Sequence, residues 1–153
     1  MTIHSHLRTS LQEKIRNSIP LCEMMQFEIE EISSRSITVH APLKPNINIH
    51  GTGFAGSLYS VGVLTGWALA DHIMSLSDMK GMLVVAGAEI KYRTPVTQDI
   101  QCSTTVSDSA CRAFVDDYKA NGKGRLQLSI HIGTSKNALL LADFMAISAS
   151  TTE

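Results

Sequence analysis

The spacing of hydrophobic side chains changes twice along this chain. In the first twenty residues they recur at every fourth position, as Leu7, Leu11, Ile15 and Ile19. This period predicts a helix that Pro20 ends. Over residues 25–41 the period falls to two, with a polar turn at 33–35. That alternation predicts a β-hairpin with one buried face and one face in solvent.

The segment from Phe54 or Ala55 to Leu76 is apolar on nearly every side, so we expect a helix that the rest of the fold encloses. It contains Gly56, Gly62 and Gly66. Each glycine costs roughly 1 kcal/mol relative to alanine in a helix interior. A very close approach by another element would explain why they are present.

More strands are expected after this helix. Residues 82–94 begin as a continuous apolar run and end in alternation, which predicts a central strand that emerges at the sheet edge. Alternation also predicts strands at 100–106 and 126–132, and after a turn at 135–137 the last strand is expected at 138–148. Residues 108–121 are either irregular or a short helix.

Strands on both sides of one core helix predict an α+β fold, with an antiparallel sheet wrapped around that helix. The length of 153 residues fits one domain over 1–153. A sheet that curls around a single helix leaves its edges and part of its concave face open. We therefore expect a second copy to cover them, as a homodimer or a dimer of dimers.

Charge and composition exclude several kinds of partner. Thirteen basic and fourteen acidic residues leave a net charge of −1, so neither nucleic acid nor an anionic membrane is expected as a partner. The three cysteines form no C-x-x-C pair, and no apolar leader follows Met1. The uncharged stretch 54–70 carries hydroxyls and glycines, as a buried helix does. We expect a cytoplasmic protein.

The order of elements resembles the hotdog fold, a curved antiparallel sheet wrapped around one long central helix. Acyl-CoA thioesterases of that superfamily carry a pattern like N-x-x-G-x-x-H-G-G where the helix begins, and here Asn48 to Gly56 reads NIHGTGFAG. The later stretch from Ile90 to Val96 resembles their strand ending. From Pro42 through Trp67 the chain more closely resembles the thioesterase family known from the C-terminal domains of YiiD-like proteins.

The same comparison exposes three departures. Phe54 stands where better-known members have histidine, and Ala55 replaces their first glycine. Their catalytic carboxylate lies nine residues after the histidine, and that position here is Val63. The resemblance therefore implies the fold, while the usual mechanism lacks its acid or nucleophile.

Thioester hydrolysis needs a group that polarises the carbonyl and a group that positions or deprotonates water. Unpaired N–H groups of Phe54 to Gly56 at the start of the helix could form an oxyanion hole. Asn48 is the candidate to orient water, or it only closes an Asx turn in the loop. His50 is the candidate base, or an exposed loop histidine.

The expected site thus has two parts. Asn48 and His50 are the candidate catalytic residues. The candidate substrate-binding residues are Gly51, Thr52, Gly53, Phe54, Ala55, Gly56 and Tyr59. Lys91 and Arg93 share a strand face and either meet CoA phosphates or form a solvated surface. No metal-binding histidine pair occurs, so neither a metal nor another cofactor is expected.

The resemblance implies an acyl thioesterase that acts on an acyl-CoA or acyl-carrier-protein thioester, with the acyl chain between subunits beside the central helix. The alternative is a non-catalytic acyl- or CoA-binding or dimerisation module, which Phe54 and Val63 favour. A hydratase or dehydratase ranks last, because His50 has no evident carboxylate partner.

Overall fold

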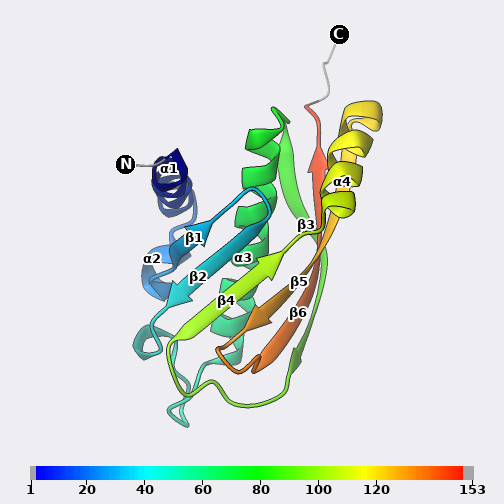
Figure 1. Ribbon diagram of the computed structural model, residues 1–153. Coiled ribbons are helices and arrows are strands. Elements are labelled where there is room, and N and C mark those ends of the chain that lie inside the picture. The colour runs from blue at the N-terminus through cyan, green and yellow to red at the C-terminus, as the bar shows by residue number, and fades with distance from the viewer. Residues whose placement is uncertain (1–2, 150–153) are drawn as a thin grey trace.

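A six-stranded antiparallel sheet curves around the long helix α3 (Figure 1). The computed structural model describes residues 3–149, so Met1, Thr2 and the last four residues of the predicted domain lie outside the described part. The helices are α1 (Ile3–Ser18), α2 (Leu21–Met25), η1 (Lys44–Asn46), α3 (Ala55–Leu76) and α4 (Asp108–Asn121). The strands are β1 (Glu28–Ile32), β2 (Ser36–Ala41), β3 (Met82–Tyr92), β4 (Ile100–Thr105), β5 (Lys123–Ile132) and β6 (Ala138–Ile147). The predicted α+β fold is confirmed.

The glycines of α3 let the helix lie directly against the sheet. A Cβ atom added at Gly62 would lie 2.8 Å from Cδ1 of Ile132, and one at Gly66 would lie 2.7 Å from Cζ of Phe144. Side chains of β5 and β6 therefore occupy the space that larger residues would need. The close approach that the sequence predicted is confirmed, and it offsets the helix propensity lost at these glycines.

Alternation in β5 and β6 places one set of side chains against α3. Leu126, Leu128 and Ile130 are buried, and the residues between them are more exposed. In β6, Leu140 and Phe144 face the same core. Burying one such side chain stabilises the fold by roughly 1.5–3 kcal/mol. These strands form as their period predicts.

The β1–β2 hairpin forms, but it starts later than the sequence indicated. Met25 was expected in the strand, and it is instead the last residue of α2. Gln26 follows in a left-handed conformation, with φ of 55°, and its N–H bonds back to the helix. Met25 and Phe27 are both buried, as the alternating pattern predicted, but Met25 lies in a helix and not in the predicted strand.

The expected central strand at 82–94 is an edge strand. The sheet order is β1-β2-β4-β5-β6-β3, so among the described strands β3 pairs only with β6. Met82, Val84 and Val85 are exposed to 63%, 38% and 41%. The prediction of a central position was wrong. A continuous apolar run is typical of a strand buried on both faces, but it does not show whether the same chain or another molecule buries it.

The ambiguous segment at 108–121 is a helix. The Ser107 hydroxyl caps α4 by accepting the N–H of Ala110 at 3.2 Å. Gly122 ends the helix with a φ of 73°, and Phe114 buries its apolar side. Within residues 3–149, no helix is long and apolar enough to cross a membrane.

Candidate active site at the start of the central helix

The loop before α3 is fixed to the rest of the fold by Asn46, which is 1% exposed. Its Nδ2 donates to the carbonyl oxygens of Met25, at 2.9 Å, and Pro42, at 2.8 Å. The main-chain carbonyl oxygen of Asn46 accepts the N–H of Phe54 at 2.8 Å. One residue thus joins the end of α2, the end of β2 and the start of α3.

Asn48 organises the tip of this loop. Its Oδ1 accepts the N–H groups of His50, at 2.8 Å, and Thr52, at 3.1 Å. Its Nδ2 donates to Oγ1 of Thr52 at 2.9 Å, and Gly51 completes the turn with a φ of 79°. This is the geometry of the Asx-turn alternative. Both ends of the amide are used within the loop, so a role for Asn48 toward water stays a prediction.

The first turn of α3 carries free hydrogen-bond donors. Phe54 precedes the helix in an extended conformation, and no side chain caps the helix start. The first bond of the helix runs from the N–H of Leu58 to the carbonyl of Phe54, at 3.0 Å. The N–H groups of Ala55, Gly56 and Ser57 therefore lack partners within the helix, where the helix dipole is positive.

The three amides expected to bind the carbonyl are not equivalent. The N–H of Phe54 already donates to Asn46. The Phe54 ring lies over Gly56, where an added Cβ would meet it at 2.6 Å. Ala55 borders an open pocket, and its N–H is the best placed of the three.

That pocket has a volume of about 320 Å³. Four residues of the expected set line it: Asn48, Thr52, Gly53 and Ala55. The other five, His50, Gly51, Phe54, Gly56 and Tyr59, do not. The N–H of Gly53 donates to the carbonyl of Val96 at 2.8 Å, so the loop closes against the segment that follows β3.

The opposite wall contains Tyr92, which the sequence did not select as a site residue, and Arg93, which it indicated only as a contact for CoA phosphates or as part of a solvated surface. Tyr92 donates its hydroxyl to the carbonyl of Ala55 at 2.8 Å, and Arg93 follows it in the wall. Both belong to the Ile90–Val96 stretch that carried part of the family resemblance, and that stretch was the available signal. The residues that line the pocket include no carboxylate and no imidazole.

An apolar pocket of about 290 Å³ lies further along α3. Tyr59, Val63 and Trp67 form its wall on α3, and Leu21 and Met25 close it from α2. Burial raises the pKa of Tyr92, and the nearby Tyr59 raises it further. These two tyrosines therefore adjoin each other, one at the polar pocket and one at the apolar pocket.

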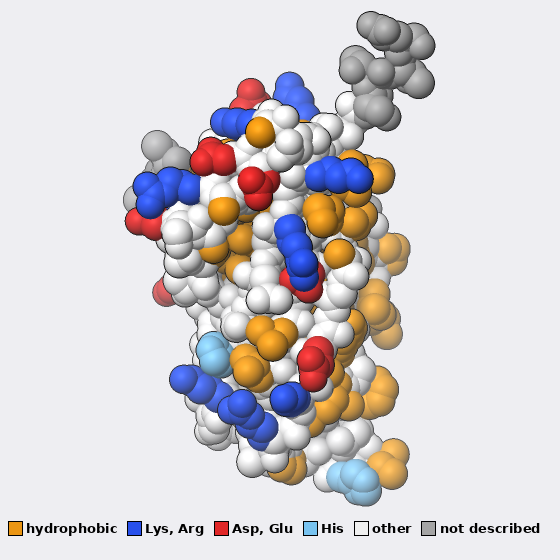
Figure 2. Space-filling view, turned by 90° about the vertical axis from the view of Figure 1, so that its right-hand side faces the viewer, with side chains coloured by type: hydrophobic (Ala, Val, Ile, Leu, Met, Phe, Trp, Pro, Cys, Tyr) orange, Lys and Arg blue, Asp and Glu red, His pale blue; other side chains and the backbone are white. Residues whose placement is uncertain are grey.

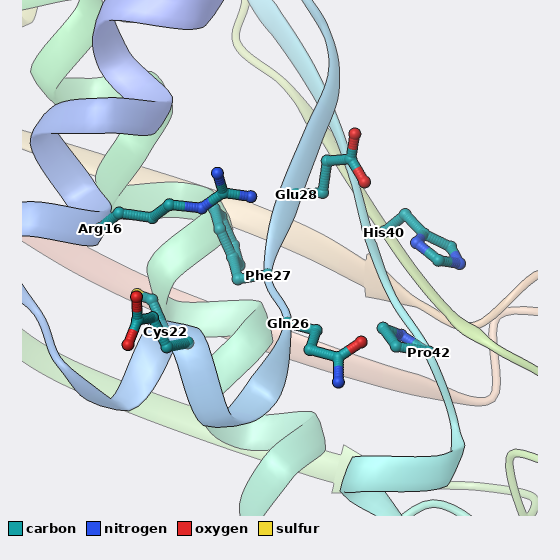
Figure 3. Close-up of a pocket in the computed structure, with 8 residues that line it drawn as sticks. Arg16, Cys22, Gln26, Phe27, Glu28, His40 and Pro42 are labelled. Carbon is teal, nitrogen blue, oxygen red and sulfur yellow. The ribbon is translucent and has the colours of Figure 1, made fainter.

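A third hollow of about 470 Å³ lies between the N-terminal helices and the β1–β2 hairpin (Figure 3). Arg16 from α1 extends toward β1, and Glu28 and His40 lie on the far side. Burial raises the pKa of the Cys22 thiol to about 11, so this cysteine is not an activated nucleophile. None of the expected site residues lines this hollow.

His40 was expected on the wet face of its strand, and it bonds there to Asp99. Its Nε2 lies 3.0 Å from Oδ2 of Asp99, while Oδ1 accepts the N–H of Leu43 at 2.9 Å. The Leu43 N–H, followed by His40, holds the pKa of the Asp99 carboxyl below its ordinary value. The pair fixes the point where the loop leaves β2. In the described part of the chain, no three or more potential metal ligands form a group.

The fold and the loop together define the class. A curved antiparallel sheet on one long helix, with a pocket at the helix start, is the hotdog architecture. The chain resembles the PaaI protein of the phenylacetic acid degradation operon of E. coli, with a TM-score of 0.66 and 12% identity over 96% of this chain and 98% of that one. This likeness shows the fold alone.

Two further solved structures are more similar. A protein of unknown function from Chlorobaculum tepidum gives a TM-score of 0.90 with 23% identity, over 95% of this chain and 97% of that one. A "putative thioesterase" from Shewanella oneidensis gives 0.81 with 28% identity, over 94% and 99%. Residues 8–146 match the family model described as "Putative thioesterase (yiiD_Cterm)". The chain belongs to this YiiD C-terminal family, as the sequence predicted.

Proposed function

We propose that this protein is an acyl thioesterase that hydrolyses an acyl-CoA or acyl-carrier-protein thioester at the pocket beside Ala55. The observation that carries the proposal is the unpaired N–H of Ala55 at the start of α3, which borders that pocket. Such a donor stabilises the oxyanion that forms when water attacks the thioester carbonyl. Membership of a thioesterase family supports the same reaction.

The acyl chain has a suitable place in the apolar pocket along α3. Val63 and Trp67 line it, and Leu21 from α2 forms part of the opposite wall. At about 290 Å³ the pocket is just below the range for small-molecule sites, roughly 300–1,000 Å³. We therefore expect a short or medium acyl chain to fit better than a long one.

A second copy is expected to complete the site. The exposed edge strand β3 ends at Tyr92, and Tyr92 and the following Arg93 form one wall of the polar pocket. A copy paired along β3 would border that pocket and cover the exposed apolar side chains of the strand. We propose a homodimer formed in this way, and two dimers can associate further.

The group that activates water is proposed from the loop. The lining residues offer no carboxylate or imidazole, so the base must come from outside the pocket of one chain. His50 is exposed at the loop tip, and Asn48 holds the backbone of that tip. We propose His50 as the base, in its own pocket or in that of the second copy, with Asn48 as the positioning residue.

The test follows free CoA released from acyl-CoAs of increasing length, with the variant Ala55→Pro. Proline at the first helical position removes one N–H and suits the helix, and Phe54 already has the extended conformation that a residue before proline needs. We expect kcat to fall by about 100-fold or more while the fold is kept. Ala55→Ser, which keeps the N–H, is the matched control. Equal activity in Ala55→Pro and Ala55→Ser would refute the role of this amide.

The absence of a carboxylate and an imidazole from the pocket lining favours one alternative, a non-catalytic acyl- or CoA-binding module. In that case acyl-CoA binds saturably and no CoA is released. Turnover that His50→Ala reduces at unchanged stability would exclude this alternative and support the proposed base.

A further inference from the structure

Basic side chains gather where β3 ends, beside the polar pocket. Lys91 is the last residue but one of β3, and Arg93 lies in the pocket wall. The N–H of Arg93 donates to the carbonyl of Asn137 at 2.9 Å, so the turn that contains Lys136 lies against this strand end. We call Lys91, Arg93 and Lys136 the basic group. In Figure 2, Lys and Arg side chains cluster in the lower part of the molecule.

The register of the sheet adds His131 to the same surface. Lys91 and His131 are both paired with Leu139, one from each neighbouring strand. Residues paired across antiparallel strands point to the same face. Leu140 is buried against α3, so Leu139 and its two partners point to the outer face of the sheet.

The basic group lacks acidic partners, unlike other basic residues of the protein. Lys14 pairs with Asp71, Arg35 with Asp108 and Arg125 with Asp143. Within residues 3–149, no ion pair involves Lys91, Arg93 or Lys136.

Two carboxylates lie in the surroundings of the group. Glu89 shares the outer face of β3, and Asp99 is already bonded to His40 and to the N–H of Leu43. The group therefore keeps a local positive charge on a chain whose net charge is −1.

We propose that the basic group binds the phosphates of coenzyme A, so that the carrier of the acyl group is this nucleotide and not a carrier protein. The inference rests on the proposed function. Arg93 belongs both to the pocket wall and to the basic group, so one ligand can reach the Ala55 N–H with its thioester and the basic group with its phosphates. Guanidinium and ammonium groups bind phosphate oxygens by charge-assisted hydrogen bonds.

The compact size of the group favours a nucleotide over a protein partner. Arg93 lies in the pocket wall, Lys91 lies two residues before it on β3, and Lys136 precedes Asn137, whose carbonyl accepts the N–H of Arg93. Three cations so close in the fold suit the pyrophosphate and the 3′-phosphate of coenzyme A. A stable protein partner usually needs roughly 1,200 Å² or more of buried surface with an apolar centre. The charges of the basic group would supply only a small part of such an interface.

The test compares three substrates with the same acyl chain: the CoA thioester, the dephospho-CoA thioester and the pantetheine thioester. In the wild-type protein we expect the CoA thioester to have a KM lower than the pantetheine thioester by about tenfold or more, with dephospho-CoA between them. Raising the salt concentration should reduce this difference, because salt screens exposed charges.

The triple variant K91A/R93A/K136A should raise the KM for the CoA thioester about tenfold more than it raises the KM for the pantetheine thioester, which has no phosphates for the basic group to bind. The matched control, K119A/K123A, removes two cations from the end of α4 and the start of β5 and should change neither substrate. Equal KM values for the CoA and pantetheine thioesters in the wild-type protein would overturn the proposal. A preference for acyl-carrier protein that the triple variant abolishes would also overturn it.

A binding experiment separates this proposal from the proposed function. Adenosine 3′,5′-bisphosphate carries nucleotide phosphates without a thioester, and its titration needs no turnover. Binding that the triple variant loses supports the phosphate site even if no thioester is hydrolysed. Hydrolysis without any such binding would leave the proposed function in place and refute the phosphate site.

Discussion

The two edges of the sheet differ in how they are finished. At the β1 edge, α1 supplies side chains where another strand would pair. The amide of Gln12 accepts the N–H of Ile29 at 2.7 Å and donates to the carbonyl of Phe27 at 2.9 Å, and Arg8 donates to the carbonyl of Glu30 at 2.8 Å. At the other edge, the eleven-residue strand β3 exposes apolar side chains and has no charged residue before Glu89.

This difference indicates which edge is completed within one chain. The β1 strand is short, carries three glutamates and contains a register irregularity, all features that discourage pairing with another molecule. The β3 strand has a register irregularity but is long and apolar. The polar pocket lies beside β3, so the proposed site borders the edge at which we propose that a second copy pairs.

The largest expected effect follows from breaking the β3 edge. In Val85→Asp, the proposed two-fold pairing would bring a charge from each copy into an apolar contact. We expect the dissociation constant of the dimer, measured by sedimentation equilibrium, to rise by about 100-fold or more. Thioesterase activity should be lost with the dimer. The folded monomer should persist, because Val85 is exposed in the single chain.

The control is the reverse charge at the other edge. Glu30→Lys changes a side chain on β1, where α1 covers the backbone, and should leave the oligomeric state unaltered. If Val85→Asp stays dimeric while Glu30→Lys dissociates, the two edges have the opposite roles to those proposed.

A smaller effect is expected from opening the covered edge. Gln12→Leu leaves the N–H of Ile29 and the carbonyl of Phe27 without partners, so we expect a loss of about 2 kcal/mol in the free energy of unfolding by urea. Gln12→Glu keeps an acceptor for Ile29 and should lose about half as much. An equal free energy of unfolding for Gln12→Leu and the wild type would show that the hydrogen bonds from α1 to this edge do not stabilise the fold.

The smallest effect concerns the reactivity of the Cys22 thiol, which lies near the β1 edge that α1 covers. Burial raises the pKa of Cys22 from 9.0 to about 11, so at pH 8 its thiolate fraction is about 100-fold below that of a free thiol. Cys102 is fully buried, with its pKa raised to about 12, and Cys111 is half-buried. We expect a thiol reagent to label Cys111 first and the other two slowly.

The pH dependence of this labelling has a definite sign. Below pH 11 the thiolate of Cys22 is the minor form, so each unit of pH increase should raise its labelling about tenfold. Gln12→Leu should speed the labelling of Cys22 at constant pH by opening the covered edge. Rapid labelling of Cys22 in the wild-type protein at pH 8 would contradict a closed β1 side.

Much of the fold could be predicted because periodicity records burial within short stretches. The apolar segment predicted α3 from Ala55 to Leu76, alternation predicted β5, and β6 was expected as the last strand after the turn at 135–137. Gly62 and Gly66 predicted that the helix packs closely against another element, which is the sheet. The candidate loop was also found, since Asn48, Thr52, Gly53 and Ala55 line the pocket.

The sequence by itself determined which residues are apolar, at what period, and hence which helix lies at the centre and which faces of the strands are inward. Only the tertiary structure decided that β3 is an edge, that Met25 ends a helix, and that Tyr92 and Arg93 close the pocket opposite Ala55. The physical reason is that burial periodicity is local. Strand order and the neighbours of a pocket depend on pairing between segments distant in the chain, as between β3 and β6.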